Sequence, residues 1–270
     1  MRRIRLVAWH VFKESVRDRV LLAIAAFAVV LVVASVLIGQ ITAGQDVKII
    51  KDIGLATLEL SGVLMAVFIG VGLVAREIER RSIYSLLAKP VARWEFVVGK
   101  YIGLVGTIAF NVTLMTVALF LMLAYLQWKT PDEVERAWLT PVVDPGLLKA
   151  VILIGAELAL LTAVALFFST FSSSGLLSAG LTLGVFVVGL LSEDLRGFTA
   201  VDSSQVLAFV VRAVGVVVPA FSAFDIKADV VNGRPPVPWA YVGLTIVYAT
   251  CYASALVGGA AAIFSRREFT

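Results

Sequence analysis

Long uncharged stretches alternate with short charged segments along this chain of 270 residues. Residues 20–45 carry no charged side chain, and residues 150–192 carry only Glu157. About 20 apolar residues in a helix cross the hydrocarbon core of a bilayer. The second stretch is too long for one helix, and "FSSSG" at 171–175 supplies a break within it. The pattern predicts six membrane-spanning helices, at residues 20–40, 53–75, 96–125, 148–170, 175–192 and 238–264.

The segment 193–237 is partly apolar but does not fit a seventh span. Arg212 lies in the middle of its apolar part, and Pro219 lies near the end of that part. An arginine at the centre of a bilayer costs about 2.5–3.5 kcal/mol on insertion scales. We therefore predict an outer loop in which residues 203–224 form a helical hairpin, either dipping into the outer leaflet or lying on it. Arg212 is a candidate outer gate charge, and the alternative is that it reaches the headgroups.

Composition and charge agree with a membrane protein. Hydrophobic residues make up 60% of the chain and charged residues 16%, which leaves too few polar groups to cover a water-soluble domain. Of the 23 Lys and Arg residues, 14 fall in residues 1–19, 76–100 and 265–270. Because basic residues mark cytoplasmic segments, both termini are predicted to be cytoplasmic. The expected fold is therefore all-α, a single polytopic membrane domain over residues 1–270 in a bacterial or archaeal cytoplasmic membrane, with membrane lipids around it and no role for nucleic acid.

The N-terminal sequence "MRRIRLVAWHVFKESVRDR" has helical periodicity. It places Ile4, Ala8, Val11 and Ser15 on one stripe, with the basic residues elsewhere. A short basic amphipathic helix of this type lies along a membrane surface. Residues 1–19 are therefore predicted to form an interfacial helix on the inner surface, with a plain basic topogenic tail as the alternative.

The sequence lacks the motifs of several enzyme and metal-binding classes. It has one cysteine, Cys251, and one histidine, His10, which excludes a multi-histidine or cysteine-rich metal site. A phosphate-binding loop is missing, as are the "HExxH" and Gly-x-Ser-x-Gly patterns. We therefore expect a subunit that is not an enzyme and carries no cofactor or metal of its own.

Two acidic residues lie within predicted spans, Glu59 and Glu157. Such residues can line a polar path or carry a proton. They can also be protonated, or hydrogen-bonded to a neighbouring helix, and so hold the bundle together. For a single acid without a visible basic partner, the second interpretation is the one that the sequence favours.

The segment "REIERRSIYSLLAKPVARWEFVVGK", residues 76–100, concentrates six basic and three acidic residues between two apolar runs. Glu77 stands four residues before Arg81, the favourable order for an ion pair on a helix. The Lys-Pro pair ends this helix, and Trp94 marks the return of the chain to the membrane interface. The pattern predicts a short helix parallel to the inner surface, suited to docking a cytosolic protein.

This segment resembles the one that follows the second span in permease subunits of type 2 class ABC exporters, most closely the branch of multicopper-enzyme maturation permeases. The basic "FKESVRDR", the tight connection near residue 173 and the terminal "FSRREF" agree with it. The resemblance implies that residues 76–95 form a cytoplasmic coupling segment seated in a separate ABC ATPase. The coupling residues that it implies are Glu77, Glu79, Arg80, Arg81, Ser82 and Tyr84.

The resemblance also implies a mechanism and partners. Two copies of the ATPase, which bind ATP and magnesium, would move the coupling segment. Two permeases, identical or paralogous, would then open a path lined by the second and fifth spans and gated by the outer hairpin. The chain has no His, Cys or Met cluster suited to copper, so copper transport is not expected.

Two other functions stay open. A membrane subunit that transmits mechanical work to an outer partner, without transport, would have the same coupling segment. A proton-coupled secondary transporter could use Glu59 and Glu157, but broken helices and an internal repeat, which are typical of that class, are not visible in the sequence. Co-purification with an ATPase separates the first two functions from the third.

Overall fold

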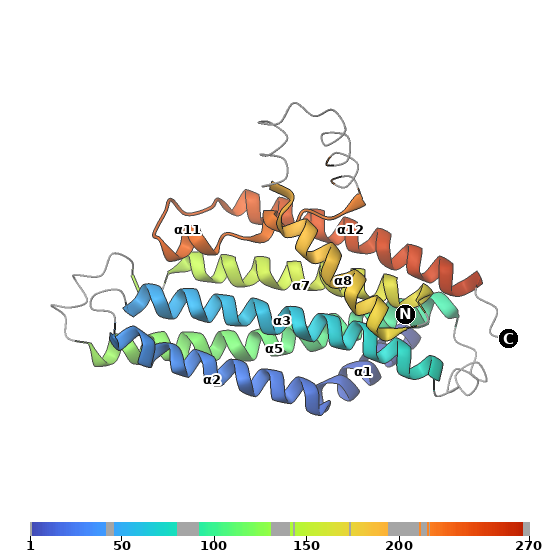
Figure 1. Ribbon diagram of the computed structural model, residues 1–270, viewed down its shortest axis with the longest axis horizontal. Helices are drawn as coiled ribbons and strands as arrows, with labels where there is room; N and C mark the ends of the chain where they lie inside the picture. Colours follow the sequence, from blue (N-terminus) through green and yellow to red (C-terminus); the bar gives the residue numbers. More distant parts are fainter. Residues whose placement is uncertain are drawn as a thin grey trace.

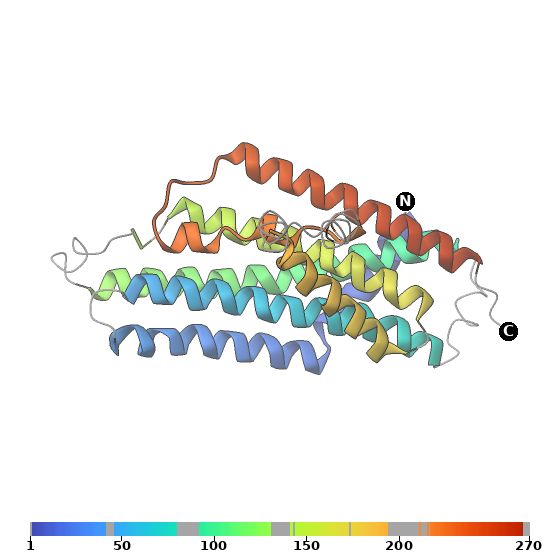
Figure 2. The same cartoon turned by 45° about the horizontal axis from the view of Figure 1, so that its top comes forward.

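The apolar runs of the sequence form long helices that lie side by side (Figures 1 and 2). The computed structural model describes residues 2–41, 46–79, 92–130, 141–142, 144–172, 174–193, 211, 215 and 217–266. No β-strand occurs within these ranges. The named elements are α1 (Arg2–Val16), α2 (Arg19–Ile41), α3 (Asp46–Glu79), α5 (Arg93–Lys129), α7 (Pro145–Phe171), α8 (Gly175–Leu190), the 3₁₀ helix η1 (Phe221–Phe224), α11 (Lys227–Val231) and α12 (Trp239–Arg266).

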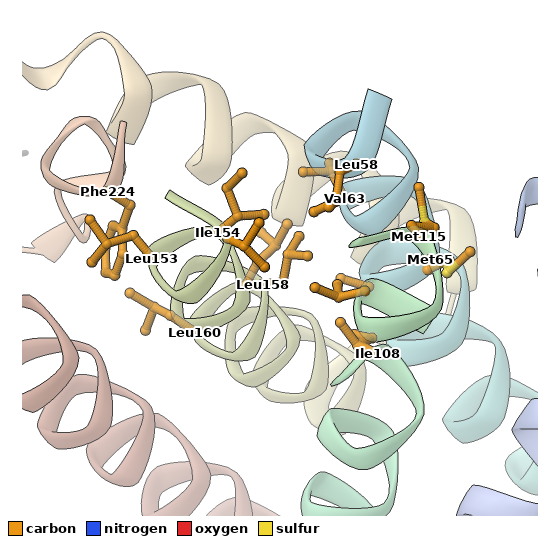
Figure 3. Close-up of a cluster of buried hydrophobic side chains, with 14 of the residues drawn as sticks. Leu58, Val63, Met65, Ile108, Met115, Leu153, Ile154, Leu158, Leu160 and Phe224 are labelled. Carbon is orange, nitrogen blue, oxygen red and sulfur yellow. The ribbon is translucent and has the colours of Figure 1, made fainter. Parts of the chain in front are cut away.

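Helices α3, α5 and α7 form the centre of the bundle. Their buried side chains interlock, as Figure 3 shows for Leu58, Met115 and Leu158, and Phe224 of η1 closes the cluster on one side. The other helices pack around this centre: α2 on α3, α12 on α7, α1 on α5, and α8 against both α3 and α7. Helix α7 is accordingly more buried than α5 and α12, with about two thirds of its most apolar part enclosed by other helices.

Among the described residues, three helices are long and apolar enough to cross a membrane, by length and composition: Arg93–Lys129, Pro145–Phe171 and Trp239–Ser265. Leu21–Ala34 and Gly175–Leu190 are shorter apolar helices. Large apolar side chains such as Phe27, Leu121 and Leu244 are more than half exposed, as expected where a helix faces lipid. The all-helical fold of a multi-pass membrane protein is confirmed for the described residues, whereas the six-span topology stays a prediction.

Two helices are longer than the sequence analysis expected. Helix α3 covers Asp46–Glu79 instead of 53–75, and α5 covers Arg93–Lys129 instead of 96–125. The charged residues that we used as boundaries do not stop a helix, because Glu, Lys and Arg are good helix formers. At about 1.5 Å per residue α5 is about 55 Å long, well beyond the roughly 30 Å of a hydrocarbon core. Helix α5 is therefore longer than a hydrocarbon core is thick, and α3, with 34 residues, is too.

The extension of α3 corrects one prediction. Residues 76–79 were expected to begin a separate surface helix, but they continue α3 without a break to Glu79. The remainder of that helix, residues 80–91, lies outside the described residues, as does most of the predicted hairpin at 203–224.

Helix α8 is shorter than the predicted fifth span. It ends at Leu190 rather than 192 and has 16 residues, about 24 Å. The connection between α7 and α8 is as tight as predicted, because the Ser172 hydroxyl donates to the Ser174 carbonyl at 2.9 Å within it. At its other end α8 meets η1, where the Phe186 and Phe221 rings lie 5.2 Å apart.

Helix α1 confirms the predicted helix at the N-terminus and shows what its stripe contacts. Ala8, Val11 and Ser15 are buried, and the stripe faces α5. Gly99 and Gly103 allow this contact, since a Cβ on Gly103 would lie 2.6 Å from the Ala8 carbonyl oxygen. The apolar stripe thus binds α1 to the protein, and its position along the membrane surface stays a prediction.

Candidate functional site

At one end of the bundle, which we call the α1 end, the start of α5 lies near α1, the end of α3 and the end of α12 (Figure 1). The first turn of α5 is closed by Glu95, whose carboxylate accepts a hydrogen bond from the Ala92 N–H at 3.2 Å. The Arg93 guanidinium donates to the Ser265 carbonyl at 2.9 Å. It thereby satisfies a carbonyl that the end of α12 would leave free, and it ties α5 to α12.

An aromatic contact reinforces this connection. The rings of Phe96 on α5 and Phe264 on α12 stack with centroids 6.1 Å apart. Lys100, only 1% exposed, places its ammonium 5.4 Å from the Phe96 ring. The two helices are therefore held together directly beside the predicted coupling segment.

Two of the six predicted coupling residues fall at this same end. Glu77 and Glu79 lie in the last turns of α3, where the backbone is helical. Arg80, Arg81, Ser82 and Tyr84 lie outside the described residues. The structure thus brings the chain to the α1 end on the extension of α3, and the contacts of these six residues stay predictions.

A cluster of charges lies toward the opposite end, which we call the α11 end. Glu59 on α3 forms an ion pair with Lys227, the first residue of α11, and the Lys227 ammonium also lies 3.7 Å from an Asp225 carboxylate oxygen. The side chains of Glu59 and Lys227 are 11% and 19% exposed. Burial lowers the pKa of Lys227, and the nearby Asp52 carboxylate opposes that shift. This pair fixes α11 on the surface of α3.

The sequence analysis missed this partner of Glu59. Lys227 is distant in sequence and lies in a segment that was expected to be an outer loop. No local spacing or motif joins the two residues, so only the packing of α11 on α3 could reveal the pair.

Two further lysines at the α11 end have little exposed surface and bind carbonyl groups. The Lys51 ammonium donates to the Pro141 carbonyl at 2.6 Å, and the Lys149 ammonium donates to the Val237 carbonyl at 2.7 Å. Lys149 also lies over the ring of Trp239, 5.0 Å from its centroid. Burial lowers the pKa of Lys51 below its ordinary value, and the field of the Asp144 carboxylate offsets only part of that shift. These contacts fix the loops that lead into α7 and α12.

Glu157 lies near the middle of α7 and is 2% exposed. Within the part of the chain that the structure describes, no hydrogen-bonding or ion-pair partner is found for its carboxyl group. Glu157 therefore lies in the core between helices, and it does not contact Glu59. Arg212, the candidate gate charge, lies outside the described residues.

Three tyrosines of α12 hold the described end of the outer segment. The Tyr241 hydroxyl donates to the Ala223 carbonyl at 2.7 Å, and the Tyr248 hydroxyl accepts from the Ala220 N–H at 3.0 Å. The Tyr252 hydroxyl donates to the Val217 carbonyl. Residues 217–224 are thus attached along one face of α12.

The described residues supply contacts between helices at both ends of the bundle. No group of three or more His, Cys, Asp or Glu side chains that could hold a metal ion occurs among the described residues. At the α1 end, the extension of α3 lies near α5 and α12, which are joined to each other by Arg93 and Phe96. Toward the α11 end, the Glu59–Lys227 ion pair and the α12 tyrosines hold the segment before α12.

Comparison with known protein families identifies the family of this chain. A family model described as "ABC-2 family transporter protein" matches residues 5–200, from α1 through α8 and beyond. The chain belongs to the ABC-2 family of transporter proteins. No sequence among the curated proteins matches it. As an ABC-2 permease it is a multi-pass membrane component of an ABC transporter and has a separate ABC ATPase as its general partner.

Proposed function

We propose that this ABC-2 permease couples ATP hydrolysis in a cytosolic ATPase to the export of a substrate. The complex contains two ATPase subunits, which bind ATP and magnesium, and a second permease that is a copy or a paralogue of this chain. The chain itself catalyses no reaction. It has six spans with both termini in the cytoplasm, and the α1 end is the cytoplasmic end.

The observation that carries the proposal is the continuity of α3. This helix extends from the ion pair at Glu59 to Glu79 at the α1 end without interruption. The twenty residues between them rise about 30 Å, which is the thickness of a hydrocarbon core. A displacement of the coupling segment by the ATPase would therefore move the charge pair on the other side of the membrane.

The contacts of α3 and α8 support the predicted path. These helices correspond to the second and fifth spans, and they pack against each other. The end of α8 also contacts η1 of the outer segment through Phe186 and Phe221. A tilt of α3 would thus reach the outer segment by two routes, through α8 and through the Glu59–Lys227 pair. Packed interfaces of this kind have discrete alternative arrangements, which suits a gate.

The test is co-purification of the tagged permease with the ATPase encoded beside it. We expect the double reversal Glu79→Lys with Arg80→Glu to abolish co-purification, because the coupling helix would present the wrong charges. The matched control is Lys13→Glu with Glu14→Lys, an exposed pair on α1, which should leave co-purification unchanged. Full ATPase binding by the Glu79/Arg80 variant would refute the assignment of the coupling segment.

Transport needs a second measurement in proteoliposomes that contain the whole complex. ATP-dependent movement of a lipid, peptide or drug would support export. ATP hydrolysis that is stimulated by an outer partner, without movement of any substrate, would support the mechanical alternative. Transport that is driven by a proton gradient in the absence of the ATPase would refute both.

A further inference from the structure

A groove of about 460 Å³ lies between α2 and α3. The two helices pack against each other and lie side by side in Figure 2. The volume is within the roughly 300–1,000 Å³ of small-molecule sites. The lining residues are Arg19, Ala23, Ile24, Phe27, Ala28, Leu31, Thr57, Leu60, Ser61 and Leu64.

The wall of this groove is almost entirely apolar. Small side chains, Ala23 and Ala28, make room on the α2 side. The Ser61 hydroxyl on the α3 side donates its hydrogen to backbone carbonyls of its own helix, such as that of Leu58 at 3.3 Å, and so has no hydrogen to donate to a ligand. An occupant must therefore be a hydrocarbon along most of its length.

One lining residue is charged, and it lies at an end of the groove. Arg19 is exposed and immediately precedes the uncharged run 20–45, so it stands where that span reaches the membrane boundary. From Arg19 to Leu31 the helix rises about 18 Å, close to the roughly 15 Å of one leaflet's hydrocarbon. A guanidinium group binds phosphate with two parallel hydrogen bonds. The apolar groove therefore matches one lipid tail, and the Arg19 charge matches the phosphate of its headgroup.

We propose that the groove binds one acyl chain of an anionic phospholipid from the leaflet at the α1 end, with the lipid phosphate on Arg19. A helix of a second permease, about 10–12 Å across, is the alternative occupant. A lipid in this position contacts α3 directly beside Thr57 and Ser61. It would therefore act on the helix that we propose as the coupling lever, although its binding does not depend on that function.

The charge is tested by native mass spectrometry of the purified full chain with added phosphatidylglycerol. We expect one phosphatidylglycerol to bind more tightly than the rest, and Arg19→Gln to weaken it roughly tenfold, the cost of a lost charge-assisted hydrogen bond. The matched control is Arg17→Gln, because Arg17 is also exposed but does not line the groove. Equal weakening by both variants would show general surface attraction and overturn the proposal.

The groove is tested by filling it. Ala23→Phe should remove the tightly bound lipid, whereas Ala26→Phe, at an exposed position of α2 that does not line the groove, should keep it. Unchanged lipid binding by the Ala23 variant would overturn the proposal. So would a change from dimer to monomer in that variant alone, since the occupant would then be a second copy. ATPase co-purification, measured on the same variants, distinguishes either failure from a failure of the proposed coupling function.

Discussion

Individual charged residues join helices in this protein. Glu59, Lys51 and Lys149 each have little exposed surface, and each reaches a partner on a different element. A charge with so little solvent contact is costly unless it is paired or hydrogen-bonded. Their partners, an ammonium group or a backbone carbonyl, supply that compensation and fix where α11 and the loops before α7 and α12 lie.

The Glu59–Lys227 pair gives a prediction at this scale. Glu59→Gln removes the carboxylate that pairs with the largely buried Lys227 ammonium and leaves it with the more exposed Asp225 at 3.7 Å and the field of Asp52, which should destabilise the fold by about 2–3 kcal/mol. The measurement is thermal denaturation of the purified protein in detergent. Asp229→Asn is the control, because its pair with Arg234 is exposed and should contribute under about 1 kcal/mol. An equal loss in both variants would contradict a special role for the Glu59 pair.

At the scale of elements, the packing of α1 on α5 depends on two glycines. A Cβ on Gly103 would meet the Ala8 carbonyl oxygen at 2.6 Å and the Val11 Cβ at 2.8 Å, both of which belong to a packed helix. Gly106 is on the same helix, but the nearest atom to its Cβ would be a ring carbon of Phe12 at 3.6 Å. The close approach of the two helices is therefore concentrated at Gly99 and Gly103.

We expect Gly103→Ala to cost about 1–3 kcal/mol through the displacement of α1. Gly106→Ala should be neutral or slightly stabilising, because alanine is the better helix former and there is room for its methyl group. Thermal denaturation gives the two free energies, and limited proteolysis of α1 reports its displacement. If Gly106→Ala destabilised the protein as much as Gly103→Ala did, the packing of α1 on α5 described above would be wrong.

At the scale of the whole molecule, topology follows from the basic segments and can be tested directly. Replacing the single cysteine, Cys251→Ser, gives a background for two single-cysteine variants, Arg17→Cys and Asn232→Cys, both at exposed positions. A membrane-impermeant maleimide should label Asn232→Cys in intact cells, and Arg17→Cys only after the membrane is opened. The reverse pattern would place the α1 end outside and refute the proposed orientation.

Much of the helical architecture could be predicted from the sequence, because long apolar runs have one stable form in a bilayer. The break at "FSSSG" predicted the α7–α8 connection, and the stripe of Ala8, Val11 and Ser15 predicted the buried face of α1. Helix ends could not be predicted as well. Charged residues at the ends of α3 and α5 mark the edge of a membrane but do not stop a helix, so both helices extend further than hydropathy alone indicates.

The sequence by itself determined that this is an all-helical membrane protein, where its apolar runs lie and which segments are basic, because those properties depend on local composition. Only the tertiary structure decided which of those helices touch. It placed α1 on α5, paired Glu59 with Lys227 across the chain, and left a groove between α2 and α3 with Arg19 at its end. These contacts join residues far apart in sequence, and they depend on how packed side chains fit together, which no local pattern records.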